Sequence, residues 1–293
     1  MRRHWVQLIV SVGQNAWLPG YLTGRLYSGN LKKICVPGLN CWSCPGAVGA
    51  CPIGAAQGVA ASAPFSLGLL PWGFLLLFGG IFGRFVCGWL CPFGFFQELL
   101  HKLPGRKGRL PRVFRFPKYF ILLIFVLLLP ILSVYGVGIG ETWYCKYLCP
   151  AGTLEAGIPL LLLIPPLRQA IGVLFYWRLL LLAVTLLLAV RFYRFFCHSL
   201  CPLGAFYSLF NRYSIVRIEW QADRCTACGR CRPACRSGLD PTREIMSPEC
   251  ILCGECVRQC PEQALVFRPV EGILTRRWTL AKAPAAAVDK AEG

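Results

Sequence analysis

The chain has 293 residues, of which 56% are hydrophobic and only 15% charged, with a formal net charge of +18. Soluble proteins carry about 25% charged residues, so this composition excludes an ordinary soluble domain and a disordered chain. Eighteen cysteines in so long a chain also exclude a small disulfide-stapled secreted domain. The composition indicates an integral membrane protein that binds metal through thiolates, whose positive charge reflects basic cytoplasmic loops and no nucleic-acid binding.

Apolar segments that approach the 20 or so residues needed to cross a bilayer recur along the first two thirds of the chain. We expect an uncleaved first helix over residues 5–22, although two arginines before a short apolar run also fit a signal peptide. Further crossings are expected over residues 64–85, 119–140 and 177–196. The fold class is therefore a membrane α-helical protein of about four transmembrane helices.

The distribution of charge predicts the orientation of these helices. No acidic residue lies between Glu98 and Glu141, and the stretch between them is basic. Its cations are Lys102, Arg106, Lys107, Arg109, Arg112, Arg115 and Lys118. Basic loops remain in the cytoplasm, so residues 23–63 and 141–170 are expected outside, in a multi-pass protein of the bacterial inner membrane. The basic stretch is either a solvated membrane flank or a docking surface for an acidic electron carrier.

Two cysteine runs near the C-terminus have the spacing of a bacterial two-cluster ferredoxin. They read Cys225-x2-Cys228-x2-Cys231-x3-Cys235 and Cys250-x2-Cys253-x2-Cys256-x3-Cys260-Pro. Three cysteines of a run wrap one cubane and the fourth reaches the other. One [4Fe–4S] cluster is expected on Cys225, Cys228, Cys231 and Cys260, and a second on Cys250, Cys253, Cys256 and Cys235. Structural zinc also uses Cys-x2-Cys but does not need this longer pattern.

These runs predict the domain organisation. Residues 1–215 form the transmembrane domain, and residues 216–270 form an α+β ferredoxin domain in the cytoplasm. The alanine-rich tail, residues 271–293, is expected to be disordered.

The other ten cysteines lie at the ends of the apolar segments. Cys-x3-Cys-Pro-x-Gly occurs at residues 87–94, 145–152 and 197–204, and a degenerate copy has Cys51-Pro-Ile-Gly with Cys44 seven residues earlier. Cys-x3-Cys places two thiolates one helical turn apart on one helix face. Each pair supplies half of the ligands of a cubane, so we expect two pairs to meet around one cluster.

The expected topology decides which pairs can meet. Cys87, Cys91, Cys197 and Cys201 reach the cytoplasmic face and supply four ligands for one cluster. Six cysteines, Cys35, Cys41, Cys44, Cys51, Cys145 and Cys149, lie on the opposite side. Either Cys44, Cys51, Cys145 and Cys149 form the outer cluster, or Cys35, Cys41, Cys44 and Cys51 do. The pair left over can form a disulfide in an oxidising compartment. Four clusters are expected in all.

Heme is not expected as a further cofactor. The three histidines, His4, His101 and His198, form no spaced pair within a crossing, and no Cys-x2-Cys-His occurs.

The repeated Cys-x3-Cys-Pro-x-Gly before a two-cluster ferredoxin run resembles the membrane polyferredoxin family, which includes NapH-type and NosR-type proteins. The segment from Cys35 to Gly54 is similar to a subgroup associated with extracytoplasmic flavin-binding domains. The resemblance covers most of residues 1–265 and implies electron transfer between the membrane or the quinone pool and another redox protein. A third cysteine pair and the outer cysteines depart from the family's two-pair pattern. The resemblance is therefore weaker support for quinol oxidation by this chain than for electron transfer.

Clusters near both membrane faces would carry electrons across the membrane, from a cytoplasmic ferredoxin or dehydrogenase to an extracytoplasmic or membrane partner. The chain has no nucleotide fingerprint, so we expect it to act as the electron-transfer subunit of an oxidoreductase complex. One alternative is quinol or quinone chemistry at one face, with Glu98, Glu141 or Glu155 as proton carriers. Another is a redox-sensing or maturation accessory protein.

Overall fold

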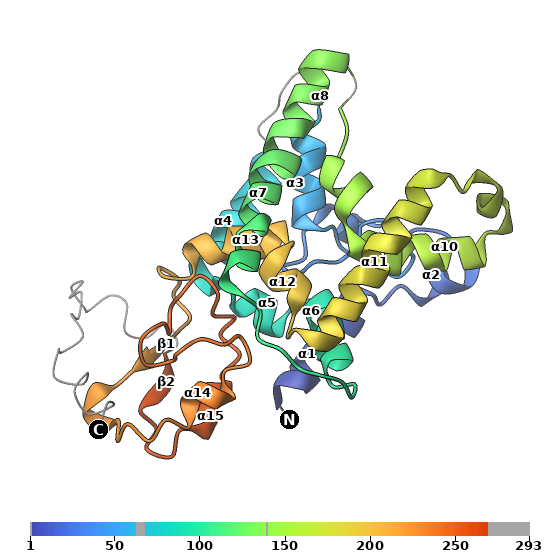
Figure 1. The fold of residues 1–293 in the computed structure, drawn as a ribbon. Coiled ribbons are helices and arrows are strands. Elements are labelled where there is room, and N and C mark those ends of the chain that lie inside the picture. Colours follow the sequence, from blue (N-terminus) through green and yellow to red (C-terminus); the bar gives the residue numbers. More distant parts are fainter. Residues whose placement is uncertain (1, 63–67, 139, 269–293) are drawn as a thin grey trace.

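The computed structural model describes residues 2–62, 68–138 and 140–268, so the predicted disordered tail lies outside the described residues. The N-terminal two thirds are helical (Figure 1). The α-helices there are α1 (Arg2–Gln14), α2 (Leu18–Thr23), α3 (Pro52–Ala60), α4 (Leu69–Phe82), α5 (Phe85–Trp89), α6 (Pro92–His101), α7 (Pro117–Ile121), α8 (Leu129–Val137), α9 (Pro150–Gly152), α10 (Ile158–Leu163), α11 (Val173–Arg191), α12 (Phe195–Ser199) and α13 (Pro202–Phe210). Shorter or wider helical turns are η1 (Asn30–Lys33), η2 (Arg112–Arg115), η3 (Leu122–Leu128), η4 (Tyr144–Leu148), η5 (Thr153–Gly157) and η6 (Pro165–Ala170).

Within residues 2–62, 68–138 and 140–268, two helical segments have the length and apolar composition to cross a membrane. One is the continuous segment Arg112–Gly136, formed by η2, α7, η3 and α8, and the other is α11. Only 22% and 17% of their most apolar windows are buried within the protein. The core helix of a soluble protein would be mostly buried, so these two helices present their apolar side chains to the surroundings.

The other two expected crossings are shorter in the structure. The segment expected over residues 5–22 is broken between α1 and α2, because the backbone leaves the helix after Gln14. Helix α4 has 14 residues, fewer than the 20 or so that a bilayer requires. Residues 63–67, where this crossing was expected to begin, lie outside the described residues. Four spanning helices therefore remain a prediction.

The C-terminal module has the small α+β fold expected from its cysteine runs. Strands β1 (Arg217–Trp220) and β2 (Leu265–Arg268) form an antiparallel pair in which Ile218 lies opposite Phe267. Between the strands the chain forms η7 (Ala222–Arg224), α14 (Cys231–Ala234) and α15 (Glu255–Gln259). The module packs beside α5, at one end of the helical part (Figure 1).

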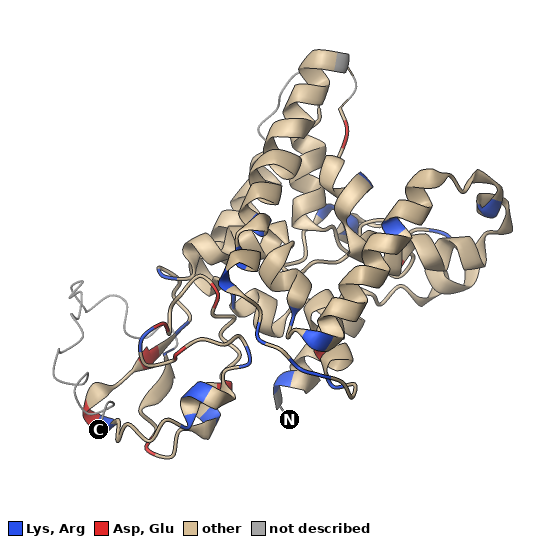
Figure 2. Ribbon diagram, viewed as in Figure 1, with Lys and Arg blue, Asp and Glu red and all other residues tan. Residues whose placement is uncertain are grey.

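The basic stretch between α6 and α7 contacts the C-terminal module. Arg112 pairs with Glu244 at 3.4 Å, and Arg115 donates a hydrogen bond to the carbonyl oxygen of Ser237 at 3.1 Å. Figure 2 shows few charges on α4, α8 and α11, while Lys and Arg recur on the module and on this stretch. Part of the predicted docking surface is therefore occupied by the chain's own module.

Candidate metal centres

The second cysteine of each repeat begins a helix. Cys51, Cys91, Cys149 and Cys201 are the N-cap residues of α3, α6, α9 and α13, and proline follows each one at the first helical position. Proline is favoured there because its missing N–H would have no partner in the helix. The backbone N–H of the glycine three residues after each cysteine is hydrogen-bonded to the sulfur. Each repeat therefore places a sulfur at the positive end of a helix.

The first cysteine of each complete pair lies in a different helix from the second. Cys87 is in α5, Cys145 in η4 and Cys197 in α12. The expectation that both thiolates lie one turn apart on a single helix face is therefore wrong. A residue that precedes proline is pushed out of the helical region, so the chain turns at the second cysteine and a new helix begins.

Four cysteines meet between α5, α6, α12 and α13, and we call this group, Cys87, Cys91, Cys197 and Cys201, the inner site. All four are only 4–6% exposed. Cys201 interacts electrostatically with the other three, and Cys91 with Cys87 and Cys197. The structure thus brings together the two pairs that were expected at the cytoplasmic face.

Two arginines exchange hydrogen bonds across the inner site. Arg84 donates through Nη2 to the carbonyl oxygen of Cys197 at 2.9 Å, and Arg194 donates to the carbonyl oxygen of Cys87. Each arginine precedes the first cysteine of its own pair by three residues and binds the first cysteine of the other pair. The exchange ties the two halves of the site together.

A carboxylate neutralises each of these arginines. Arg194 Nε lies 2.9 Å from Glu98, and Arg84 Nη1 lies 3.1 Å from Glu249 of the C-terminal module. Burial alone would raise the pKa of Glu98, but Arg194 and Arg3 outweigh it and lower the pKa to about 2. Glu98 is therefore a structural counter-ion in this structure, because a carboxylate with so low a pKa does not take up protons near neutral pH.

Gln97 connects the two pairs of the inner site. It follows Cys91 by six residues, and its Oε1 accepts a hydrogen bond from the backbone N–H of Phe196 at 3.0 Å. Its Nε2 donates to the sulfur of Cys197 at 3.1 Å. One amide side chain thus holds both the backbone and the thiol of the opposite pair.

The eight cysteines of the C-terminal module line two separate cavities. The distal site consists of Cys225, Cys228, Cys231 and Cys260, and the proximal site consists of Cys235, Cys250, Cys253 and Cys256. The fourth cysteine of each run lies with the first three of the other run. These are the two groups assigned from the spacing.

The proximal site contacts the inner site through the backbone. A Cβ atom added to Gly88 would lie 2.2 Å from the carbonyl oxygen of Ile251, so only glycine allows this approach. Trp89 donates its indole N–H to the carbonyl oxygen of Leu252 at 3.0 Å. Gly88 follows a cysteine of the inner site, and Ile251 follows a cysteine of the proximal site. The backbone segments that carry the proximal and inner sites are therefore in van der Waals contact.

Glu249 anchors the module to the helical part. Its carboxylate receives Arg84, Lys118 at 2.5 Å and Nδ1 of His198 at 3.2 Å. Burial lowers the pKa of His198 to about 3, so the imidazole is neutral at physiological pH. The two cations have no exposed side-chain surface. This carboxylate therefore keeps two buried positive charges paired.

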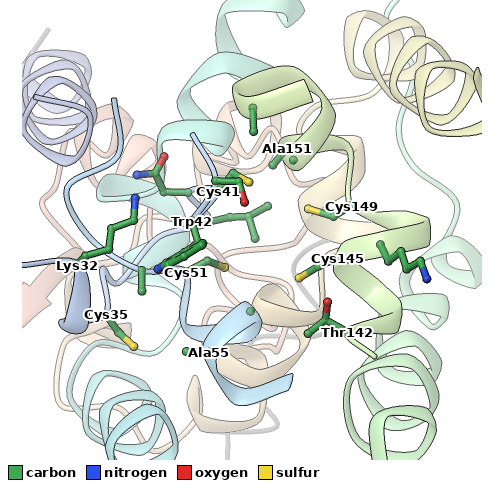
Figure 3. Close-up of a pocket in the computed structure, with 18 of the residues that line it drawn as sticks. Lys32, Cys35, Cys41, Trp42, Cys51, Ala55, Thr142, Cys145, Cys149 and Ala151 are labelled. Atoms are coloured by element: carbon green, nitrogen blue, oxygen red, sulfur yellow. The ribbon is translucent and has the colours of Figure 1, made fainter. Parts of the chain in front are cut away.

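A cavity of about 660 Å³, which we call the outer cavity, is lined by a second group of cysteines (Figure 3). Its cysteines are Cys35, Cys41, Cys51, Cys145 and Cys149. Cys44 does not line it, although both assignments made from the sequence include Cys44. The thiol of Cys44 instead donates to Asn15 Oδ1 at 3.5 Å and lies 3.4 Å from the hydroxyl of Tyr21. All 18 cysteines are free in the structure, so no leftover pair forms a disulfide.

The inner site and the outer cavity share one core. The backbone N–H of Leu39 is hydrogen-bonded to Cys91, and that of the next residue, Asn40, to Cys51. Consecutive Cα atoms lie 3.8 Å apart, so adjacent residues of one segment reach both groups. A Cβ atom added to Gly38 would lie 2.9 Å from the Cα of Cys91, which shows how closely this segment passes.

Aromatic side chains fill the space between the two groups. Tyr144 and Tyr207 are almost fully buried in the core cluster that also contains Cys51, Cys91 and Cys149. Phe196, in the same core, packs edge-to-face on Phe93 with ring centroids 5.1 Å apart. Trp42, which lines the outer cavity, is 52% exposed. The described aromatic residues therefore keep water from the inner site more completely than from the outer cavity.

The cysteine groups fit a cubane better than a single metal ion. A tetrahedral zinc site with bonds of about 2.3 Å brings its sulfurs to within about 4 Å of one another. Among the residues that the structure describes, no three His, Cys, Asp or Glu side chains are close enough for one ion. Buried thiols in groups of four, with backbone N–H groups donating to sulfurs, suit the ligand shell of a [4Fe–4S] cluster.

Comparison with known proteins identifies the family. A family described as a 4Fe-4S binding domain matches residues 64–111, 119–161 and 174–220, and a second one of the same description matches residues 244–266. Together they cover more than half of the chain. The chain belongs to the ferredoxin-type 4Fe-4S binding proteins. The resemblance inferred from the cysteine motifs is thereby confirmed.

Several relatives show the extent of this similarity. Two uncharacterized proteins of Methanocaldococcus jannaschii are 29% and 30% identical over 64% of this chain, which covers 65% and 73% of their own lengths. The ferredoxin-type protein NapH of Haemophilus influenzae is 27% identical over 70% of this chain and 69% of its own length. The chain thus spans just under two thirds of one of these relatives. No solved structure matches it.

Several residues that support these sites were not singled out from the sequence. A signal for two of them was present, because Cys-Pro-x-Gly-x-x-Gln occurs at residues 51–57 and again at 91–97. Arg-x2-Cys likewise occurs at residues 84–87 and 194–197. The backbone N–H groups of residues 39 and 40 left no such signal, since any residue except proline carries one.

Proposed function

We propose that this chain is an electron-transfer subunit that carries electrons across a membrane through four [4Fe–4S] clusters, between a cytoplasmic redox protein and an extracytoplasmic or membrane partner. The observation that carries the proposal is the succession of four cysteine-lined groups, in which the distal and proximal sites belong to one module, the proximal site contacts the inner site, and the inner site shares a core with the outer cavity. When bound, the clusters would supply one-electron oxidation and reduction. The chain's own residues set the spacing between them.

Short distances between sites support this proposal, because electronic coupling decays steeply with distance. The proximal and inner sites meet where Gly88 packs on Ile251. The inner site and the outer cavity meet at Leu39 and Asn40. No step in the sequence of sites then needs to cross the full 30 Å or so of a bilayer core.

Two observations support a membrane location with the module in the cytoplasm. Helix α11 is apolar and little buried. Near its start Arg178 lines the outer cavity, and near its end the carbonyl oxygen of Ala189 lies 3.2 Å from Nδ1 of His101 in α6. The basic stretch contacts the module through Arg112 and Arg115. Basic segments remain in the cytoplasm, so the module would lie there, and the outer cavity would lie deeper in the bilayer or toward its far side.

The cations of the outer cavity support an anionic partner on the far side. Lys33 and Arg178 line the cavity together with the buried Lys32 and with Lys146, which pairs with Glu141 at 2.5 Å. We propose that the acceptor or donor there is an extracytoplasmic protein with a bound flavin, whose phosphate or acidic surface would suit these cations. On the opposite side the distal site, with Cys228 exposed, would exchange electrons with a cytoplasmic ferredoxin or dehydrogenase.

The test uses the full chain, loaded with clusters and reconstituted in vesicles that contain trapped ferricyanide. A membrane-impermeant reductant is added outside, and the loss of ferricyanide is followed by absorbance. Vesicles with the module outward should reduce the trapped acceptor, and a Cys253→Ala variant, which interrupts the proximal site, should not. Reduction no faster than in empty vesicles would overturn the proposal.

Sidedness and quinone chemistry are tested in the same vesicles. Single cysteines replacing Lys102 and Arg168 should react with an impermeant maleimide from opposite sides, as read by mass spectrometry of the labelled peptides. Labelling of both from one side would remove the transmembrane route. Strong slowing by a quinone-site inhibitor would instead favour lateral electron transfer at one face.

A further inference from the structure

We infer that the ligands of the outer cluster are Cys41, Cys51, Cys145 and Cys149, and that Cys35 and Cys44 are not ligands. The inference rests on the proposed function, since it assumes that the outer cavity holds a cluster. It combines Cys41 with Cys145 and Cys149, which neither of the two ligand sets expected from the sequence does. The geometry that supports it is a supporting framework found twice in this chain.

The first half of the framework repeats that of the inner site. Gln57 follows Cys51 by six residues, as Gln97 follows Cys91. Its Oε1 accepts from the backbone N–H of Tyr144 at 2.9 Å, and its Nε2 donates to the sulfur of Cys145 at 3.3 Å. These are the same two hydrogen bonds that Gln97 makes to the residue before Cys197 and to Cys197 itself. Cys51 and Cys145 therefore occupy the positions of Cys91 and Cys197.

The outer cavity lacks an equivalent of Cys87. The residue four positions before Cys51 is Ala47, which is fully buried and has no sulfur. Cys149, which follows Cys145, supplies the equivalent of Cys201. The fourth ligand must therefore come from Cys35, Cys41 or Cys44 in the N-terminal loop.

The second half of the framework selects Cys41. Glu155 follows Cys149 by six residues, and its Oε2 accepts a hydrogen bond from the backbone N–H of Cys41 at 2.6 Å. A Cβ atom added to Gly152 would lie 3.7 Å from the sulfur of Cys41. A Cβ atom added to Gly54 would lie at the same distance from the sulfur of Cys145. The repeat that begins at Cys149 thus holds Cys41 as the repeat that begins at Cys51 holds Cys145.

The four thiols also surround one space. Cys145 interacts electrostatically with Cys149, Cys51 and Cys41. Figure 3 shows the labelled side chains of Cys41, Cys51, Cys145 and Cys149 around the centre of the cavity, with Cys35 to one side. Cys35 interacts with only one other cysteine, Cys51.

Cys44 is already satisfied elsewhere. Its sulfur is hydrogen-bonded with Asn15 and Tyr21, and the backbone N–H groups of Gly46 and Ala47 also point to it. The largest influences on this thiol are its burial, Tyr21, Gly46, Glu155 and Ala47, and none of them is a cysteine. Movement of this sulfur into the cavity would break these contacts.

The experiment compares alanine variants of the full chain, purified anaerobically with its clusters. Iron and acid-labile sulfide per chain are measured, together with the EPR spectrum after reduction. Wild type should hold about 16 iron, as four cubanes require, and Cys41→Ala and Cys149→Ala should each hold about 12. The matched controls Cys44→Ala and Cys35→Ala should retain the wild-type content and spectrum.

A second variant covers the case in which Cys41→Ala does not fold, as judged by its elution volume. In Cys41→Ser the hydroxyl can replace the thiolate, and the EPR signal of one cluster should shift while the other signals stay. If Cys44→Ala or Cys35→Ala loses a cluster while Cys41→Ala keeps four, or Cys41→Ser leaves every signal unchanged, the ligand assignment fails and the proposed function stands. A wild type with only about 12 iron, unchanged in Cys149→Ala, would overturn both.

Discussion

The inner site and the outer cavity are built on one plan from different parts of the chain. The inner site joins two complete Cys-x3-Cys-Pro-x-Gly repeats, which cross-brace each other through Arg84 and Arg194. The outer cavity has one complete repeat, one repeat that lacks its first cysteine, and a loop that carries Cys41. Neither outer repeat has an arginine three residues before its first position.

The hydrogen bonds around the capping cysteines therefore recur at both sites, whereas the complete Cys-x3-Cys spacing does not. In three of the four cases, the residue six positions after the capping cysteine accepts a hydrogen bond from the backbone of another segment that carries a cysteine of the same group. These residues are Gln57, Gln97 and Glu155. In the fourth case Tyr207 reaches the carbonyl oxygen of Pro37, in the loop between the sites. If Cys41 is a ligand, the framework holds a cysteine from a separate loop through its backbone N–H.

The largest effect should come from removal of a capping cysteine. Cys201→Ala should lower the iron content from about 16 to about 12 per chain and abolish reduction of the trapped acceptor, because the inner site lies between the module and the outer cavity. Iron analysis and the vesicle assay measure both. Reduction of the trapped acceptor by Cys201→Ala at the wild-type rate would show that the inner site is not on the electron route.

Loss of a cross-bracing arginine should destabilise the inner site alone. Arg194→Met leaves Glu98 buried without its main counter-ion, and removal of one partner of a buried pair costs about 3–5 kcal/mol. Thermal unfolding in detergent should show a clear decrease in stability. Arg112→Met is the matched control, since its pair with Glu244 is exposed and should contribute at most about 1 kcal/mol.

The same ion pair predicts a dependence on pH. The pKa of Glu98 is lowered to about 2 in the folded chain, against about 4.3 in an unfolded one, which corresponds to about 3 kcal/mol. A lowered pKa contributes stability that is fully present above the unfolded value and is lost as the pH falls through the folded value. Glu98→Gln should therefore be less stable than wild type at pH 6, and the difference should shrink below about pH 4. A constant difference would contradict this account.

The smallest effect should come from the two glutamines. Gln97→Leu and Gln57→Leu each remove a donor to a cysteine sulfur and leave one backbone N–H without its acceptor, which costs about 1–3 kcal/mol. Loss of an N–H···S hydrogen bond should lower the reduction potential of the cluster concerned. Redox titration followed by EPR should show one signal shifted in each variant. Shifts of opposite sign would show that the two frameworks are not equivalent.

The sequence was sufficient for the parts whose ligands are close along the chain. The two runs between Cys225 and Cys260 imply their own pairing, because the fourth cysteine of a run is too far to close on its own cluster. The structure also brings together the two complete pairs of the inner site, which the expected topology placed at one face. Membership of the 4Fe-4S family followed from these motifs.

The position of the outer loop could not be read from the sequence. Cys41 and Cys44 are both in a loop with no helical or strand period, so no face can be assigned to either. Their places depend on contacts with residues more than 100 positions away, such as Glu155, and on local partners such as Tyr21. The proline after each capping cysteine does mark the break of the backbone there, but the two cysteines of a pair then lie in different helices and not on one helix face.

The segment at Leu39 and Asn40 has a consequence for the energetics of the two neighbouring groups. Adjacent amides point to sulfurs of different groups, so the two groups lie close together. Negative charge added to one group would therefore make the addition of negative charge to the other less favourable. In a redox titration the two groups would then behave as a pair, and the measured midpoint potentials would belong to the pair and not to either group alone. Withdrawal of an electron from the far side would in turn favour refilling from the near side, so that successive charges would move through the pair one at a time.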